Sequence, residues 1–267
     1  MIHPLLLSAR ASGKKLLAVL VDPDKAKRDN LGHLAEFANA GLIDVFLWGG
    51  SLVNAPQASY HLGLLKSLLN DTPVILFPGS TYQLDDQADG LLLLSLLSGR
   101  NPDLLIGRHV QVAGRIKQMN LTPTATGYLL IDGGRPTSVS YMSNTTPIPA
   151  DKPSIAAATA LAGEQLGMKL IYMDAGSGAL NPVSPKTIYC VRREVTLPIV
   201  VGGGIRTPDR AAEALEAGAD MVVIGNGLEK DATWLPELAA AVRRASATEI
   251  TDDASKTVAA KKPVART

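Results

Sequence analysis

Cysteine, aromatic side chains and excess charge are all scarce in this sequence. Among 267 residues there is one cysteine, Cys190, and aromatic residues make up only 4%. A single cysteine excludes a disulfide scaffold and a cysteine-rich metal site, and it fits a reducing compartment such as the cytoplasm, where we expect the protein. The 26 basic and 25 acidic side chains leave a net charge of +1, so no nucleic acid partner is expected.

Long hydrophobic runs are also absent. The longest, around residues 91–97, is far shorter than the roughly 20 apolar residues that a membrane-spanning helix needs. The opening residues 1–7 carry no basic side chain ahead of their leucines, so we expect neither a secretory signal nor a membrane segment. Hydrophobic residues still make up 46% of the chain, which is enough for a large globular core.

Short apolar runs rich in Val, Ile and Leu recur along the chain and alternate with helical patterns. Most of the runs are continuous, which is typical of parallel strands covered on both faces. Eight such repeats predict an α/β protein of one domain, a (β/α)8 TIM-type barrel. The alternative, an open doubly wound sheet, would place a glycine-rich turn after the first strand, where Asp22-Pro23-Asp24-Lys25 stands instead. The predicted strands are 16–21, 43–48, 74–77, 91–94, 128–131, 170–173, 199–201 and 221–224.

The barrel domain is expected to span residues 1–245. Residues 246–267 are small and polar, and predict a disordered C-terminal tail. The link between 76 and 91 has room for only a turn of helix. The long polar connection 132–153 follows the fifth strand, and it fits either a lid over the barrel mouth or a plain surface excursion.

Glycine-rich loops follow the last two predicted strands, at 201–205 and 224–227. Glycine lets backbone N–H groups approach a ligand closely, and barrels frequently bind phosphate at the loops after strands seven and eight. Tight turns are the alternative reading of one such loop, but two in adjacent positions favour a phosphate site. After the sixth strand, Ser177 and the N–H groups of Gly176 and Gly178 would close the same cradle, and Asp174 would lie at the strand end where catalytic groups of barrels lie.

Carboxylates follow the first predicted strand at Asp22 and Asp24. Their hard oxygens suit Mg2+, which binds one or two carboxylates and completes its shell with water and substrate phosphates. A simple Asp-Pro-Asp turn explains the same residues equally well. Ser51 follows the second strand, and its hydroxyl would face the same ion.

Taken together, these motifs resemble the geranylgeranylglyceryl phosphate synthase family. The resemblance runs from about residue 17 to residue 227 and rests on an ordered set of motifs. These are Leu20-Val-Asp-Pro-Asp-Lys25, Trp48-Gly-Gly-Ser51, Phe77-Pro-Gly-Ser80, Tyr172-Met-Asp-Ala-Gly-Ser-Gly-Ala179, Val201-Gly-Gly-Gly-Ile-Arg206 and Gly225-Asn226.

The resemblance implies a (β/α)8 barrel that binds sn-glycerol 1-phosphate and a polyprenyl diphosphate with Mg2+, forms an ether bond and releases diphosphate. It also implies a homo-oligomer. Asp22 and Ser51 match the family's Mg2+ positions, and Asp22 and Asp174 are the expected catalytic residues. Asp174 departs from the family, which commonly has glutamate there, one methylene longer. The expected glycerol phosphate contacts are Tyr172, Met173, Asp174, Ala175, Gly176, Ser177, Gly178, Gly203, Gly204, Gly225 and Asn226.

Geranylgeranyl diphosphate is the donor that the resemblance implies. An apolar tail of this length needs an apolar groove, which we expect to be lined by Trp48, Phe77, Tyr82 and the leucines near Leu96. Two other functions fit the glycine loops alone. One is another phosphate-handling barrel enzyme, such as a sugar-phosphate isomerase or a thiamine phosphate synthase-like transferase, and the other is a non-catalytic phosphate-binding barrel.

Overall fold

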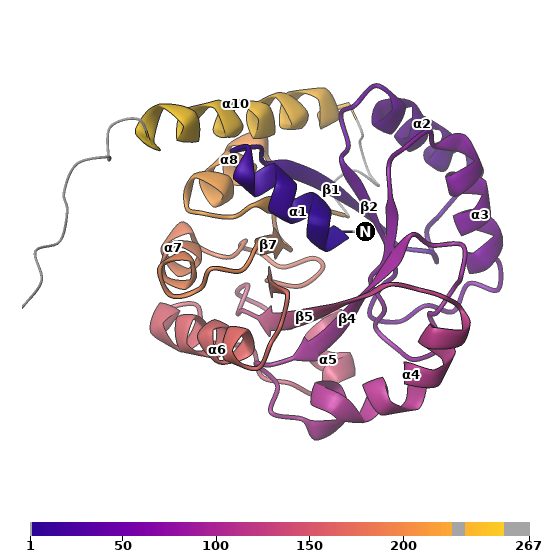
Figure 1. Cartoon of the computed structure of the whole chain (residues 1–267), viewed down its shortest axis with the longest axis horizontal. Helices are drawn as coiled ribbons and strands as arrows, with labels where there is room; N and C mark the ends of the chain where they lie inside the picture. Colours follow the sequence, from indigo (N-terminus) through magenta and orange to yellow (C-terminus); the bar gives the residue numbers. More distant parts are fainter. Residues whose placement is uncertain (1, 226–232, 254–267) are drawn as a thin grey trace, which may run out of the picture.

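Eight parallel strands close into a barrel, which confirms the predicted fold (Figure 1). The structure is a computed structural model and describes residues 2–225 and 233–253. Each strand pairs with its neighbours in sequence order, and β8 returns to pair with β1. The strands are β1 (Leu16–Val21), β2 (Val45–Trp48), β3 (Val74–Leu76), β4 (Gly90–Leu96), β5 (Pro123–Leu130), β6 (Leu170–Asp174), β7 (Ile199–Gly202) and β8 (Met221–Ile224).

Helices surround this barrel and cover most of its outer face. No helix of the described residues is long and apolar enough to cross a membrane. The helices are α1 (Ile2–Ala11), α2 (Arg28–Asn39), α3 (Ala58–Leu68), the π-helical turn η1 (Asp103–Gly107), α4 (Arg108–Gln118), α5 (Ser138–Ser143), α6 (Pro153–Gln165), α7 (Pro185–Glu194), α8 (Pro208–Glu216) and α10 (Leu235–Asp253).

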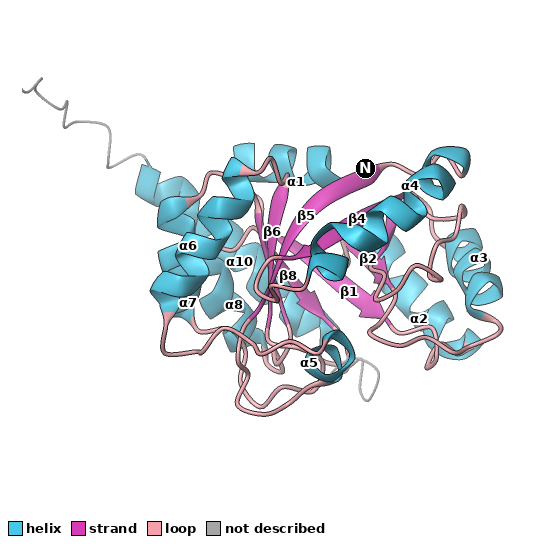
Figure 2. Cartoon of the chain, turned by 90° about the horizontal axis from the view of Figure 1, so that it is seen from below, coloured by secondary structure: helices cyan, strands magenta, loops and turns pink. Residues whose placement is uncertain are grey.

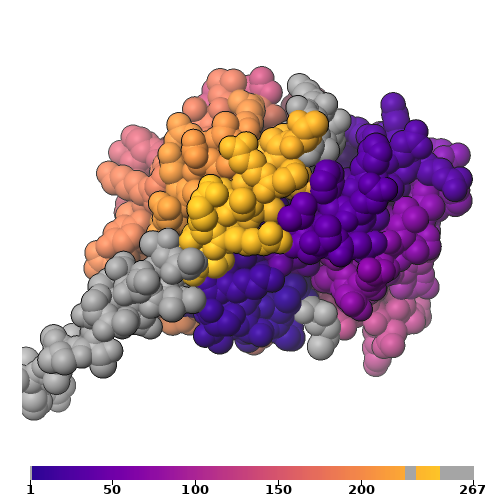
Figure 3. Space-filling model, turned by 90° about the horizontal axis from the view of Figure 1, so that it is seen from above, coloured from indigo at the N-terminus to yellow at the C-terminus, as the bar shows by residue number. Residues whose placement is uncertain are grey.

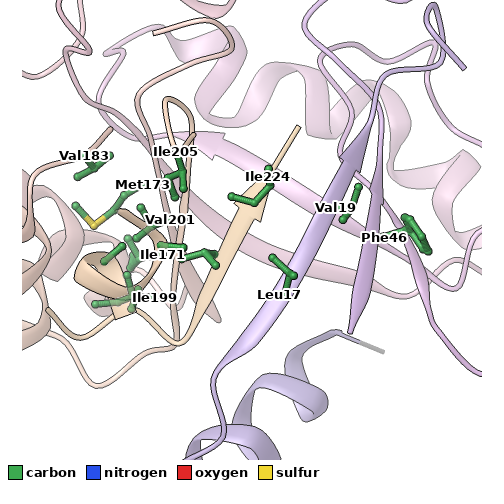
Figure 4. Packing of buried hydrophobic residues seen from close by; sticks show 14 of the residues in the cluster. Leu17, Val19, Phe46, Ile171, Met173, Val183, Ile199, Val201, Ile205 and Ile224 are labelled. Carbon is green, nitrogen blue, oxygen red and sulfur yellow. The ribbon is translucent and has the colours of Figure 1, made fainter. Parts of the chain in front are cut away.

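Two apolar layers follow from the alternation of side chains along each strand. Residues that point outward, such as Leu17 and Phe46, pack beneath the helices (Figure 4). Residues that point inward, such as Leu16 and Leu47, fill the barrel interior. Both faces are therefore buried, which explains why the strand sequences are continuously apolar.

Helix α1 closes the amino-terminal end of the barrel, a role that the sequence analysis did not anticipate. Its Ile2 and Leu6 are buried in the inner layer, and the helix crosses the centre of the ring of strands in Figure 1. At this end α10 also lies against the first residues of the chain (Figure 3), with the Ser246 hydroxyl accepting a 2.8 Å hydrogen bond from the Lys15 N–H. The opposite end, with α5 and the long loops, is left as the mouth (Figure 2).

Two boundaries differ from the expectations. Helix α10 continues to Asp253, beyond the expected end of the domain at residue 245, while the rest of the expected tail, 254–267, lies outside the described residues. Residues 77–89, which link β3 to β4, form turns and bends without a helix. As a result, no helix of the part of the chain that the structure describes covers the outer face of the barrel between α3 and η1.

Candidate functional site

A cavity of about 1080 Å³ opens at the carboxyl end of the strands. It brings together residues from the first, second, sixth, seventh and eighth strand ends, as expected for parallel strands whose ends converge on one mouth. Nine of the predicted site residues line it: Asp22, Ser51, Tyr172, Asp174, Ser177, Gly178, Gly203, Gly204 and Gly225.

Three of the predicted glycerol phosphate contacts do not line the cavity. Met173 alternates with Tyr172 and Asp174 along β6, so its side chain is buried in the outer layer beneath the helices. Ala175 is buried, with its N–H bonded to the Gly202 carbonyl at 3.1 Å. The N–H of Gly176, expected to face phosphate, instead donates to Asp174 Oδ1 at 2.7 Å. Asn226 lies outside the described residues.

Asp174 is the buried carboxylate at the centre of the site. Besides the Gly176 N–H on Oδ1, it accepts a 2.5 Å hydrogen bond at Oδ2 from the hydroxyl of Tyr128 on β5. In the barrel register Asp174 stands between Leu130 of β5 and Gly202 of β7. Each Asp174 oxygen thus accepts one hydrogen bond within the protein and can accept another from a ligand in the cavity.

Burial sets the protonation of these groups. Loss of water raises the pKa of Asp174, while the hydrogen bonds from Tyr128 and Gly176 act in the opposite direction. Burial, and then the nearby Asp174 charge, raise the pKa of Tyr128 and Tyr172 well above the ordinary value. Both phenols therefore stay protonated at neutral pH, and Tyr128 is the donor of its hydrogen bond to Asp174.

The sequence analysis missed Tyr128 as a site residue. Its position is two residues before Leu130 on β5, and it pairs in register with Tyr172 on β6, so both rings face the barrel interior. Phe77 stacks on Tyr172 with ring centroids 5.0 Å apart and lies 6.1 Å from the Tyr128 ring. Counting every second residue along the fifth strand would have placed Tyr128 on the inner face.

Gly203 permits the closest approach between the turns after β6 and β7. Its φ is +78°, and a Cβ there would lie 2.6 Å from the Gly176 nitrogen and closer still to Asp174 Oδ1. Any side chain at this position would push the two turns apart. Gly225 differs. It lines the cavity, but the nearest described atom to a Cβ built there would be 3.7 Å away.

Asp22 and Asp24 have different roles on the opposite side of the mouth. Asp22 lines the cavity, and its Oδ2 lies 3.2 Å from the Lys25 ammonium. Asp24 turns away and accepts N–H bonds of 2.8 Å from Asn54 and 2.7 Å from Ala55. Asp24 therefore fixes the loop after β2, while Asp22, whose Oδ1 accepts the Asp24 N–H at 3.1 Å, faces the cavity.

The oxygen donors on this side suit a hard cation. One carboxylate, Asp22, and the hydroxyl-bearing Ser51 line the same wall. Among the described residues, no group of three or more acidic, histidine or cysteine side chains is placed to hold a metal ion without further ligands. Mg2+ commonly uses one or two carboxylates and takes its other ligands from water and substrate phosphates, so this donor set fits Mg2+.

An apolar groove extends from the mouth along β4. Leu91 and Leu93 on the outer face of β4, with Val112 of α4, line the cavity where no helix covers the link from β3 to β4. Phe77, Tyr82 and Leu96 also line the cavity, as the sequence analysis expected. Trp48 does not. It belongs to the outer core beneath the helices, because it occupies an outward position on β2.

The long connection after β5 lies over the mouth. Its start is tied down by pairing of Ile131 with Ile148 and by a 2.8 Å bond from the Asp132 N–H to the Ile148 carbonyl. Helix α5 then brings Val139 and Met142 to the cavity (Figure 2). This connection contributes to the wall of the site rather than forming only a surface excursion.

Comparison with known proteins shows the family of this chain. The PcrB family model matches residues 12–243. The chain is 50% identical to the geranylgeranylglyceryl phosphate synthase of Spirosoma linguale, over 88% of this chain and 94% of the relative. The synthase of Chitinophaga pinensis is 49% identical, over 90% and 95%.

Solved structures agree with these relatives. The (S)-3-O-geranylgeranylglyceryl phosphate synthase of Thermoplasma acidophilum, in complex with substrate sn-glycerol-1-phosphate, superposes with a TM-score of 0.85 at 29% identity, over 91% of this chain and 99% of that one. A thiamine phosphate pyrophosphorylase from Pyrococcus furiosus reaches only 0.53 at 17% identity, over 89% and 97%, which shows a shared fold alone. Since the family model covers nearly the whole barrel and the relatives match over nearly their full length, this chain belongs to the PcrB family, among the geranylgeranylglyceryl phosphate synthases.

Proposed function

We propose that this protein transfers a geranylgeranyl group from geranylgeranyl diphosphate to the free primary hydroxyl of sn-glycerol 1-phosphate. The reaction forms an ether bond, releases diphosphate and serves phospholipid biosynthesis. The observation that carries the proposal is a single cavity that joins three parts: a glycine cradle, the buried Asp174 and a leucine-lined groove. These parts suit a phosphate, a reacting hydroxyl and a prenyl tail respectively.

The acceptor is positioned by the loops after β6, β7 and β8. Ser177, Gly204 and Gly225 line the cradle, where backbone and hydroxyl donors suit a phosphate. The glycerol hydroxyl would then lie beside Asp174, which accepts its proton as the oxygen attacks the allylic carbon. The bond from that carbon to the diphosphate oxygen breaks in the same reaction, and the electron pair leaves with diphosphate.

Asp174 suits this role although it is shorter than glutamate. Tyr128 and Gly176 hold its two oxygens in place, so no side-chain freedom is lost when the substrate binds. Burial raises the pKa of Asp174, which makes its carboxylate a stronger base than an exposed aspartate.

Asp22 and Ser51 are the residues that we propose to hold Mg2+ with the donor diphosphate. A bound Mg2+ would neutralise the negative charge that develops on the departing diphosphate. Lys25, 3.2 Å from Asp22, adds positive charge to the same wall of the cavity. We further propose a cytoplasmic homo-oligomer, in keeping with the lone cysteine and the family resemblance.

A direct assay of the reaction tests the proposal and the donor together. Radiolabelled prenyl diphosphates of twenty and thirty-five carbons are each incubated with sn-glycerol 1-phosphate and Mg2+. We expect an ether-linked product, with higher kcat/KM for the twenty-carbon donor, because each buried CH2 contributes about 0.8 kcal/mol only as far as the groove extends. Absence of product with either donor would refute the function, and a clear preference for the longer donor would refute the assigned chain length.

Gly225→Ala tests the cradle without disturbing the fold. The added methyl group meets no described atom nearer than 3.7 Å but projects at the cavity wall. We expect KM for sn-glycerol 1-phosphate to rise roughly ten-fold, the effect of losing about one hydrogen bond to a charged group, with KM for the prenyl donor unchanged. Gly203→Ala is the contrasting variant, and its clash with Asp174 and Gly176 should lower Tm. Equal changes in both KM values for Gly225→Ala would contradict the cradle assignment.

Asp22→Asn and Asp24→Ala separate ligand binding from loop structure. Asp22→Asn keeps the side-chain shape but removes the charge, so we expect activity to fall at least roughly 100-fold with Tm preserved. Asp24→Ala removes acceptors of backbone N–H bonds and should lower the free energy of unfolding by about 1–3 kcal/mol. Mg2+ titrations of activity and thermal melts distinguish the two, and normal Mg2+-dependent turnover of Asp22→Asn would exclude its metal role.

A further inference from the structure

Four cationic side chains line the cavity, and among the described residues only one of them, Lys25, has a carboxylate partner. Lys25 is paired with Asp22 at 3.2 Å, and Arg206 donates to the carbonyl oxygens of Ala179 and Leu180. Arg108 and Arg135, like Arg206, have no carboxylate within ion-pair distance among the described residues. They differ from Arg206, both of whose Nη atoms donate to carbonyl oxygens of the turn after β6. A guanidinium in this position is suited to an anionic ligand, because its planar donors match phosphate oxygens.

Arg108 lies on the metal side of the mouth. Its Nη1 donates to the Gly79 carbonyl at 3.2 Å. Gly79 packs tightly on the loop after β2, since a Cβ there would lie 2.9 Å from Ser51 Cα. On the same loop, a Cβ on Gly50 would lie 3.7 Å from Asp22 Oδ1. A chain of contacts therefore connects the Arg108 guanidinium to the proposed Mg2+ position.

The local helix geometry fixes Arg108 in this place. It follows the π-helical turn η1, a rare form of helix that often occurs at functional sites. The next residue, His109, also lines the cavity, and its Nε2 bonds the Leu94 carbonyl of β4 at 2.7 Å. The start of α4 is thus attached to the barrel wall, beside the apolar groove.

Arg135 lies on the other side of the mouth, over the glycine cradle. It is in the connection after β5, and a Cβ built on Gly178 would lie 2.9 Å from its Nη2. Gly178 lines the cavity with Ser177 and Gly203. Arg108 and Arg135 therefore stand at the two separate places where anionic groups are expected.

We propose that Arg108 binds the diphosphate of the prenyl donor and that Arg135 binds the phosphate of the glycerol acceptor. This inference rests on the proposed function and deepens it. Two multiply charged substrates repel each other within one cavity, and a dedicated cation for each offsets that repulsion. The same arrangement favours correct placement, since each substrate is attracted to a different wall.

Crossed kinetics of Arg108→Gln and Arg135→Gln test the assignment. For Arg108→Gln we expect KM for geranylgeranyl diphosphate to rise roughly 10- to 100-fold, as for loss of a hydrogen bond between charged groups, with little change in KM for sn-glycerol 1-phosphate. Arg135→Gln should show the reverse pattern. Calorimetric titration of each full-length variant with inorganic diphosphate plus Mg2+, and separately with sn-glycerol 1-phosphate, should show the same crossed losses without turnover.

Arg115→Gln is the matched control. Arg115 is on the same helix and donates to the neighbouring carbonyl of Thr81 at the same 3.2 Å, yet it does not line the cavity. It should leave both KM values within about two-fold of wild type, which separates anion binding from attachment of the loop. If Arg108→Gln lowers Tm markedly, Arg108→Lys keeps the charge and should restore part of the diphosphate binding.

The outcomes distinguish this inference from the proposed function. If the wild-type protein forms no ether product, the proposed function fails. If the wild type is active but Arg108→Gln binds diphosphate as wild type does, or weakens both ligands equally, the assignment of Arg108 is overturned. Unchanged binding of sn-glycerol 1-phosphate by Arg135→Gln overturns the assignment of Arg135 in the same way.

Discussion

A buried carboxylate between two barrel strands is the constraint on which the site depends. Asp174 can remain ionised away from water only if fixed donors replace that water, and Tyr128 and Gly176 supply them. This requirement brings the turn after β6 close to the turn after β7, where Gly203 leaves no room for a side chain. The proposed phosphate cradle and the proposed base are therefore parts of one packed arrangement.

Much of this arrangement could be predicted from the sequence, because its signals are local. Continuous apolar runs predict buried parallel strands, and all eight are present in a closed barrel. Loops at the carboxyl ends of such strands must meet at one mouth, so Asp22, Ser51, Asp174 and Gly225 could be placed together before any coordinates.

The remaining features depend on contacts between distant segments, which no local pattern encodes. Tyr128 becomes a site residue only through the register of β5 with β6, and the Gly176 N–H is taken by Asp174 instead of facing phosphate. Trp48 was expected in the groove but points into the outer core, because a shift of one position along a strand reverses the face. Arg108 is joined to the mouth by its bond to Gly79, in the link between β3 and β4 that has no helix.

The pH dependence of kcat in wild type and Tyr128→Phe tests the role of this carboxylate most directly. As the proposed base, Asp174 accepts a proton only when ionised, so kcat should fall as pH drops through its raised pKa. Tyr128 stabilises the ionised form, and Tyr172 is the other titratable group facing Asp174. Removing the Tyr128 hydroxyl should therefore shift the acidic limb to higher pH by about one unit, the equivalent of one charged hydrogen bond. An acidic limb at the same pH in both proteins would contradict Asp174 as the base held by Tyr128.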